Sequence, residues 1–269
     1  MTLRIGVVGC GTIGGEICAA IDGGTVPATL VGISDASAEA AERLASRLRS
    51  RPPILPLERL IASADLIVEA TARSVAPGII LAALRGSANV MVMSVGGLLA
   101  CREEACALAE KAGRQIYVPS GAIAALDAVK GAAVGRIDQV RLTTRKPPRA
   151  LDGAPYVVQQ GIRLDQISHA TTIFSGSALE AIDGFPANVN VAIALSLAGL
   201  GPEKTQVRVV ADPGCDRNIH EVEVEGEFGR LVARVENLPS PTNPKTSYMA
   251  ALSAIALLKR LTSSLVVGT

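Results

Sequence analysis

Three glycines near the N-terminus constrain the fold of this chain more than any other feature. Gly9, Gly11 and Gly14 form a G-x-G-x-x-G motif within the stretch GCGTIG. The apolar run LRIGVVG (3–9) leads into the motif and has the pattern of a strand, and GEICAAI (15–21) follows it with the spacing of a helix. At such a junction glycines allow a tight turn, a close approach of the backbone to a pyrophosphate, and close helix–strand packing. The motif therefore predicts a βαβ unit that binds a dinucleotide.

An acidic residue stands where such a unit needs one. Asp35 ends a second predicted strand, TLVGISD (29–35), 21 residues after Gly14 (35 − 14). A carboxylate at this point accepts hydrogen bonds from the adenosine ribose. Ala-Ser-Ala follows, without an Arg or Lys close by to neutralise a 2′-phosphate, so we expect NAD to be preferred, with NADP possible. We expect Thr12 and Ile13 of the loop to contact the cofactor. The alternative is a glycine-rich turn that binds no nucleotide.

Strands and helices continue to alternate up to about residue 120. Further strands are predicted at 65–71, 89–94 and 115–120, and further helices at 39–48, 78–86 and 102–113. The pattern predicts an α/β fold class, with a Rossmann-type doubly wound parallel sheet over residues 1–120. EATA (69–72) and PSGAIAAL (119–126) follow strands of this sheet and reach its carboxyl edge, where a cofactor would lie. The cofactor contacts expected there are Ala70, Thr71, Ser120, Gly121 and Ala122.

From about residue 136 the pattern changes to longer strands with alternating polar residues. These are predicted at 138–145, 205–212, 218–226 and 230–237, with Gly226 to Gly229 turning the last two into a hairpin, and helices are predicted at 176–185 and 185–201. They indicate a smaller α+β domain with a mainly antiparallel sheet, residues 121–240, as the substrate and catalytic domain. Residues 241–269 are expected to form a C-terminal loop and a helix that packs back toward the first domain.

Composition excludes several classes of function. The chain has 26 Lys plus Arg residues, 25 Asp plus Glu residues and no Trp. It therefore offers neither a basic surface nor aromatic side chains for base stacking, which argues against nucleic-acid binding. The five cysteines form no C-x-x-C pair, so we expect no disulfide framework and no metal site, and the cytoplasm is the predicted compartment. Secretory-signal features are absent from the N-terminus, and the charge-free stretches are shorter than the roughly 20 residues that span a bilayer.

The strand NIHEVEVEG (218–226) holds one of the two histidines of the chain. Alternation puts His220, Val222 and Val224 on one face and the intervening glutamates on the other, so the histidine points inward. The strand pattern by itself favours a neutral core histidine bonded to a neighbouring carbonyl. An inward side chain of the second domain can also face the first domain across a cleft, which is a common place for ligand pockets.

Five further motifs, spread over most of the chain, give a more specific indication. They are SGAIAALD at 120–127, TTRKPP at 143–148, FPANVNVA at 185–192, DPGCDRNIHEVEVEGEFG at 212–229 and NPKTS at 243–247. With these motifs in this order behind a dinucleotide fingerprint, the chain closely resembles the L-aspartate dehydrogenase family.

The resemblance implies NAD(P)-dependent oxidative deamination of L-aspartate to iminoaspartate, which either hydrolyses to oxaloacetate and ammonia or supplies quinolinate and NAD synthesis. It implies that His220 of the N-x-H motif is catalytic, that Ala124 and Asn190 contact the cofactor, and that the protein is a homodimer. Members of the family commonly have glycine where this chain has Ala124 and Ala125. A histidine suits the chemistry, because hydride leaves the α-carbon only from a neutral amine and an imidazole of ordinary pKa can take the ammonium proton. His169 lies outside the motifs and is expected to be structural.

A dicarboxylate substrate requires cations, and the motifs offer several. Lys245 is the first candidate because it precedes the last helix, whose loop would be brought to the cleft. The other residues considered for substrate binding are Thr246, Arg145, Lys146, Asn188 and, beside the N-x-H motif, Arg217. For each single cation, a solvated surface charge is the competing interpretation.

Other functions stay open at this stage. Dehydrogenases with a cysteine nucleophile do not fit, because none of the cysteines has the S-C-T/N-N context, and the paired histidines of dihydrodipicolinate reductases are absent. One alternative is a dehydrogenase of another small acidic amino acid or imine. Another is a non-catalytic NAD-binding redox sensor, which would keep the glycine loop and Asp35 but would need neither His220 nor Lys245.

Overall fold

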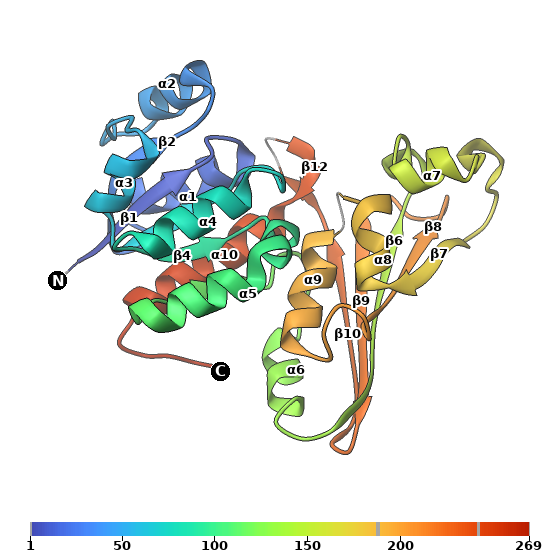
Figure 1. Ribbon diagram of the computed structural model, residues 1–269. Helices are drawn as coiled ribbons and strands as arrows, with labels where there is room; N and C mark the ends of the chain where they lie inside the picture. The colour runs from blue at the N-terminus through green and yellow to red at the C-terminus, as the bar shows by residue number, and fades with distance from the viewer. Residues whose placement is uncertain (1, 187–188, 241–242, 269) are drawn as a thin grey trace. The chain divides into compact units, whose positions relative to one another are not determined.

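The computed structural model describes residues 2–186, 189–240 and 243–268, with the side chains of 243–246 left out of the description. Its contacts divide the chain into two compact units (Figure 1). Unit 1 runs to Pro119 and also contains Ala251–Val266, and unit 2 contains Ser120–Ala250 and the residues from Val267 onward. Each unit is described by itself below.

Unit 1 is built on a parallel sheet of five strands in the order β2-β1-β3-β4-β5. The strands are β1 (Leu3–Val8), β2 (Ala28–Ser34), β3 (Leu66–Glu69), β4 (Asn89–Val92) and β5 (Ile116–Tyr117). The chain starts in β1, adds β2 on one side and then returns to add β3 on the other. Between β1 and β3 the strand order therefore reverses, which is the place where doubly wound sheets bind ligands at their carboxyl ends. The prediction of a Rossmann-type sheet is confirmed.

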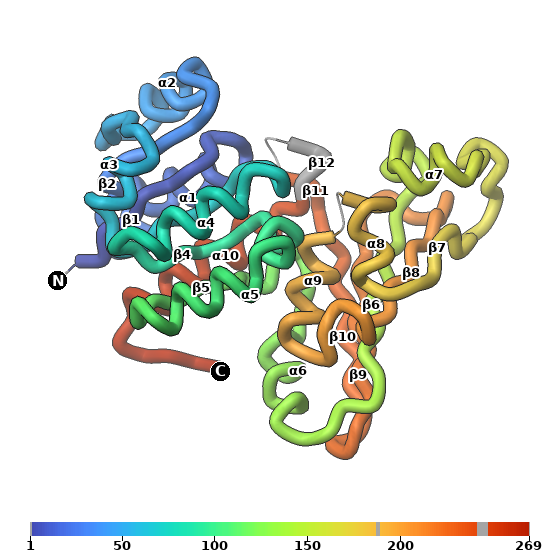
Figure 2. Tube along the Cα trace, viewed as in Figure 1, coloured from blue at the N-terminus to red at the C-terminus, as the bar shows by residue number. Residues whose placement is uncertain are grey.

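Helices cover both faces of this sheet. Buried residues of α1 (Thr12–Asp22), α2 (Ala38–Arg47) and α10 (Tyr248–Thr262) share one hydrophobic core with the strands. In Figure 2 the C-terminal α10, drawn in red, lies among the blue and green segments of unit 1, far from it in sequence. On the other face α3 (Leu57–Ser63) brings Leu60 against Gly6 and Gly32, and α4 (Ala76–Arg85) and α5 (Val95–Ala112) pack on each other.

Two features of these helices were not predicted. The short α3 was missed altogether, and α5 begins at Val95 rather than at residue 102. Its first turns read VGGLLA, where two glycines and an unbroken apolar run hide the helical period. Non-helical backbone at Cys101 marks the junction between this apolar part and the amphipathic part that the sequence predicted.

Unit 2 contains a second five-stranded sheet in the order β10-β9-β6-β8-β7. The strands are β6 (Ile137–Lys146), β7 (Thr171–Ser177), β8 (Gln206–Ala211), β9 (Asn218–Gly226) and β10 (Gly229–Asn237). All neighbouring pairs are antiparallel except β6 and β8, so the prediction of a mainly antiparallel sheet is confirmed. Gly226 pairs with Gly229 at the predicted hairpin. Strand β7 was not predicted.

Helices α6 (Leu126–Ala132), α8 (Ala178–Gly184) and α9 (Val189–Ala198) cover one face of this sheet (Figure 1). An insert of three short helical segments joins β6 to β7: η1 (Pro148–Leu151), α7 (Pro155–Gln159) and η2 (Leu164–Gln166). The uncovered face is charged, and ion pairs such as Arg141 with Glu223 and Arg230 with Glu225 cross its strands.

The segment that leads into α10 was predicted to be a loop, and this prediction is wrong. Strand β11 (Pro239–Ser240) pairs antiparallel with β12 (Asn243–Ser247). The prolines of this segment argue against a central strand, but they are tolerated in a ribbon of only two strands, whose outer edges need no ladder hydrogen bonds. Among the described helices, none is both long enough and apolar enough to cross a membrane.

Candidate active site

The glycine loop of unit 1 has the geometry of a dinucleotide cradle. Gly9 has a φ of 101°, and a Cβ at this position would collide with the carbonyl oxygen of Ala70. A Cβ on Gly14 would collide with the carbonyl oxygen of Gly9, whereas a Cβ on Gly11 would meet no described atom within 4 Å. The outer glycines are therefore required by packing, and the middle one leaves the backbone open to a ligand.

Gly11 is also the N-cap of α1, and no side chain caps the helix there. Gly11 has no side chain that could accept from the first N–H groups of α1, and together with the positive end of the helix dipole these N–H groups favour a phosphate group. Thr12 and Ile13 form the first turn of α1. These features fit the pyrophosphate of a dinucleotide.

Asp35 follows directly on β2 and fixes the glycine loop. Its Oδ2 accepts a hydrogen bond of 2.6 Å from the backbone N–H of Cys10, and its Oδ1 accepts one of 2.8 Å from the N–H of Ser37. A carboxylate oxygen can accept two hydrogen bonds, so each oxygen keeps capacity for a ribose hydroxyl. The residue thus fits its predicted role and has a second one, which is to hold the loop in place.

A buried acid that the prediction did not single out joins the loops after β3 and β4. Glu69 is 0% exposed, and its Oε1 accepts hydrogen bonds of 2.7 Å from both the N–H and the hydroxyl of Thr71. Its Oε2 accepts one of 3.0 Å from the N–H of Ser94, whose hydroxyl donates to the carbonyl of Thr71 at 2.6 Å. Glu69 therefore holds in place Ala70 and Thr71, two of the predicted cofactor contacts. An acid at the end of an apolar strand was the signal in the sequence.

In unit 2, His220 lies where the apolar face of the sheet ends. Across β6 and β9 the buried pairs are first Val140 with Val224, then Leu142 with Val222, and finally Thr144 with His220. The inward orientation of the histidine is confirmed, because only 4% of it is exposed. Thr144 was not predicted as part of the site, although its place in TTRKPP and the period of the strand were both visible.

The environment of His220 keeps its ring neutral. The hydroxyl of Thr144 lies 3.0 Å from Nδ1 of the ring. Burial, and then the positive charge of Lys146, lower the pKa of His220 to about 3. Lys146 follows Thr144 by two residues on the same face of β6 and is 6% exposed. Burial lowers the pKa of this lysine to about 8.

Two of the other predicted cations, Arg145 and Arg217, are paired with carboxylates. Arg145 lies on the opposite face of β6 from His220, and its Nη1 is 2.7 Å from Oδ2 of Asp212. This placement argues against the predicted substrate contact of Arg145, because successive residues of a strand face opposite sides. Arg217 pairs with its neighbour Asp216 at 2.6 Å. His169 is exposed, in keeping with a structural or solvent-facing position.

The loop SGAIAAL opens unit 2 and is clamped to the end of β10. The side-chain amide of Asn237, which is buried, donates to the carbonyl of Ala122 at 3.0 Å and accepts from the hydroxyl of Ser247 at 2.9 Å. Gly121 has a φ of 66°, and Ala125, the N-cap of α6, has a φ of 70°. Ser120 and Ala124 are half-buried. Sequence reasoning missed Asn237, whose role depends on two partners distant in the chain.

The remaining predicted contacts lie in, or next to, segments of the chain that are outside the description. Asn190 lies in the first turn of α9 and is exposed. Asn188 lies outside the described residues. Lys245 and Thr246 belong to β12, but their side chains are outside the description.

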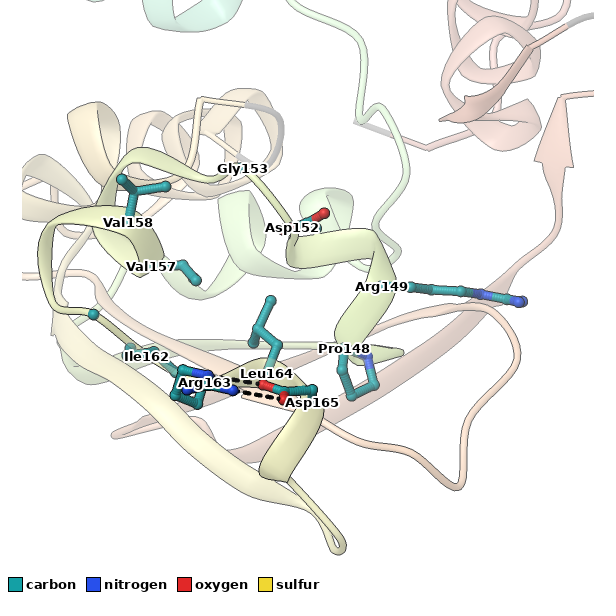
Figure 3. A pocket seen from close by; sticks show the side chains of 11 residues that line it. Pro148, Arg149, Asp152, Gly153, Val157, Val158, Ile162, Arg163, Leu164 and Asp165 are labelled. Atoms are coloured by element: carbon teal, nitrogen blue, oxygen red, sulfur yellow. Dashed lines mark hydrogen bonds and ion pairs between the residues drawn. The ribbon is translucent and has the colours of Figure 1, made fainter.

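A separate depression of about 550 Å³ lies within the insert between β6 and β7, lined by residues between Pro148 and Asp165 (Figure 3). None of the predicted site residues lines it. Arg163 and Asp165, which Figure 3 shows joined across its rim, form an ion pair of 3.0 Å with each other. The charge of this arginine is therefore already compensated.

Two family models match the chain. The model described as aspartate dehydrogenase, C-terminal, matches residues 127–261. The model described as homoserine dehydrogenase, NAD binding domain, matches residues 9–119. The boundary between these matches falls near the boundary between the two units.

Curated relatives match over nearly the whole length. The L-aspartate dehydrogenase of Methanosarcina mazei is 50% identical over 270 residues, which covers 99% of this chain and 100% of that protein. The L-aspartate dehydrogenase of Methanocella arvoryzae is 51% identical over 268 residues, with 99% of each chain covered. The crystal structure of aspartate dehydrogenase from Thermotoga maritima has a TM-score of 0.77 at 23% identity and covers 100% of both chains, which supports the fold.

Proposed function

The chain belongs to the L-aspartate dehydrogenase family, and from this premise we propose that it oxidises L-aspartate to iminoaspartate with a nicotinamide dinucleotide. The observation in the structure that best supports this activity is the buried, neutral imidazole of His220 beside the ammonium group of Lys146. A base and a cation are the two groups that an anionic amino acid requires.

Unit 1 would hold the cofactor. The start of α1 would bind the pyrophosphate, Asp35 would accept hydrogen bonds from the adenosine ribose, and the loops joined by Glu69 would contact the remainder of the dinucleotide. When bound, the nicotinamide supplies the hydride acceptor for the α-carbon of the substrate. The residues of the chain bind, orient and move protons.

His220 would take the proton of the substrate ammonium, because only the neutral amine can release hydride from its α-carbon. If the ring donates from Nδ1–H to the hydroxyl of Thr144, its Nε2 is left as the proton acceptor. An imidazole with so low a pKa becomes a useful base only when negative charge arrives next to it. A carboxylate of the substrate brings this charge.

The preference for NAD rests on Asp35. Its carboxylate suits a ribose with free hydroxyls and repels a 2′-phosphate. Asp35→Ala is expected to weaken NAD binding and to narrow the preference over NADP, measured as kcat/KM for each cofactor. An unchanged preference would locate the selectivity elsewhere.

The substrate is tested with the purified full-length protein. NADH formation is followed at 340 nm against a panel of L-amino acids at alkaline pH, with NAD and NADP in parallel. We expect a strong rate with L-aspartate and little with the others. Turnover of another small acidic amino acid, and not of L-aspartate, would identify that amino acid as the substrate. NAD binding without turnover of any amino acid in the panel would favour the function of a non-catalytic redox sensor.

Two expectations accompany this function without a direct test so far. The cytoplasm remains the predicted compartment, from the absence of a C-x-x-C pair in the sequence. The homodimer remains a prediction that light scattering can check. Whether iminoaspartate hydrolyses or supplies quinolinate synthesis depends on the enzymes that share its compartment.

A further inference from the structure

Lys146 is a buried cation for which the described residues provide no acidic partner. It is 6% exposed at the end of β6, and no carboxylate of the described residues lies within 4.0 Å of its ammonium group. Residues 187–188 and 241–246, whose side chains are outside the description, contain no Asp or Glu. Burial is the cause of its lowered pKa, and no carboxylate offsets it.

The neighbouring residue shows what an ordinary arrangement would be. Arg145 is more exposed, and its guanidinium is paired with Asp212 on the other face of the sheet. Asp212, which follows β8, therefore pairs with the partly exposed Arg145 and not with the buried Lys146. A buried ammonium without a counter-charge lowers stability, and such groups usually acquire a partner or give up their proton.

A ligand that offsets the cost of burying the Lys146 ammonium group must be an anion. It must also reach the end of the buried face of the unit 2 sheet. Thr144 and His220 lie there next to Lys146, so the anion binds beside the imidazole. Lys146 and Thr144 lie on the same face of β6, and Thr144 pairs with His220 on β9, so the ammonium group and the ring share this end of the buried face. The positive charge of Lys146 contributes to the lowered pKa of His220.

We propose that the ammonium group of Lys146 binds a carboxylate of the amino-acid substrate and thereby places its amino group next to His220. This inference rests on the proposed function and names the residue that recognises the anion. The bound carboxylate cancels the charge that disfavours a protonated imidazole, so it also makes His220 a stronger base. Substrate binding and activation of the base are then one event.

The test uses three variants of the full-length enzyme. Lys146→Met removes the charge and keeps the length of the side chain, and Lys146→Arg keeps the charge. Lys204→Met removes an exposed lysine of the same unit and serves as the matched control. Met is expected to fold at position 146, because replacing an unpaired buried charge with an apolar side chain is often neutral or stabilising.

Two readouts are measured for each variant. The first is the KM for L-aspartate at saturating NAD. The second is the Kd for succinate, a dicarboxylate without an amino group, by calorimetry in the presence of NADH. For Lys146→Met we expect both constants to rise roughly 30-fold or more, as for loss of one partner of a buried charge pair. Lys146→Arg should retain part of the affinity, and Lys204→Met all of it.

A folded Lys146→Met variant that binds succinate as wild type does would overturn the proposal. Reduced kcat with unchanged KM and unchanged succinate affinity would also overturn it, because the lysine would then act on the amine proton instead. Succinate binding needs no turnover, so the result is separate from the proposed function. If wild type binds succinate through Lys146 but does not oxidise L-aspartate, the proposed reaction is wrong and the proposed role of Lys146 in binding a carboxylate stands.

Discussion

At Ala125 the backbone has a φ of 70°, in the left-handed region that L-residues with a Cβ rarely adopt. For a residue with a Cβ this conformation costs about 1–2 kcal/mol. Glycine avoids this cost in the folded chain, but its greater conformational freedom in the unfolded chain offsets part of the gain in stability. Ala125→Gly should therefore raise the free energy of unfolding by about 0.5–1 kcal/mol, measured by urea denaturation.

The matched control is Ala128→Gly. Ala128 is exposed within α6, where glycine is expected to lower stability by about 1 kcal/mol. Opposite signs at two alanines three residues apart would show that backbone conformation decides the effect. A loss of stability at both positions would contradict the assigned conformation of Ala125.

A second prediction follows from the pKa of Lys146, which burial lowers from 10.5 to about 8. Below pH 8 both the folded and the unfolded chain carry this proton, and the full cost of burying the charge is present. Between the two pKa values only the unfolded chain is protonated, so stability rises with pH. Wild type should gain up to about 3 kcal/mol relative to Lys146→Met over this range.

Urea denaturation of both proteins at several pH values between 7 and 10.5 measures this difference, because titration of all other groups cancels in the comparison. Parallel curves for wild type and Lys146→Met would show that Lys146 keeps its ordinary pKa.

At the scale of single residues, the sequence could predict which way a side chain faces but not what it meets. The period of two in β9 was enough to turn His220 inward. Its contact with Thr144 depends on the register between β6 and β9, which no local pattern specifies. Arg145 and Lys146 were equal candidates in the sequence analysis, although adjacent residues of a strand face opposite sides, and in the fold one is paired with Asp212 while the other is buried.

At the scale of elements, the loops after β3 and β4 act as one unit because Glu69 bonds to both. In Glu69→Gln one carboxylate oxygen becomes an NH₂ group, which cannot accept from Thr71 or Ser94. We expect the Kd for NADH, measured by fluorescence, to rise about tenfold, since hydrogen bonds to a charged group contribute about 1.5–3 kcal/mol.

Glu104→Gln is the control, because this glutamate is exposed on α5 and its ion-pair partner among the described residues, Arg85, also lies at the surface. It should bind NADH as wild type does. If Glu69→Gln also binds NADH normally, the loops that it joins do not contact the cofactor.

Elements with a strong period were predicted well, and the errors have physical causes. β9 was predicted with its observed bounds because alternating glutamates mark it residue by residue. β7 was missed because TTIFSGS has little alternation and ends in small polar residues. In β11 and β12, prolines suggested a loop although a ribbon of two strands tolerates them.

At the scale of the molecule, the parallel direction of the strands in unit 1 followed from the alternation of strands and helices, because a helix between two strands of one sheet brings the second strand back parallel to the first. The parallel pairing of β6 with β8 in unit 2 did not follow. Alternation of polar residues indicates a half-exposed strand but not its direction, and the insert of η1, α7 and η2 together with β7 and two helices separates these strands in the chain.

The proposed function requires that His220 transfers a proton in a reaction whose cofactor is bound by unit 1. The most direct test compares the rate of NADH formation from L-aspartate by wild type and by His220→Ala, together with the Kd of each for NADH. Turnover should fall by about two to four orders of magnitude, as for loss of a general base, with the Kd nearly unchanged. Turnover at the wild-type rate in His220→Ala would remove this histidine from the mechanism.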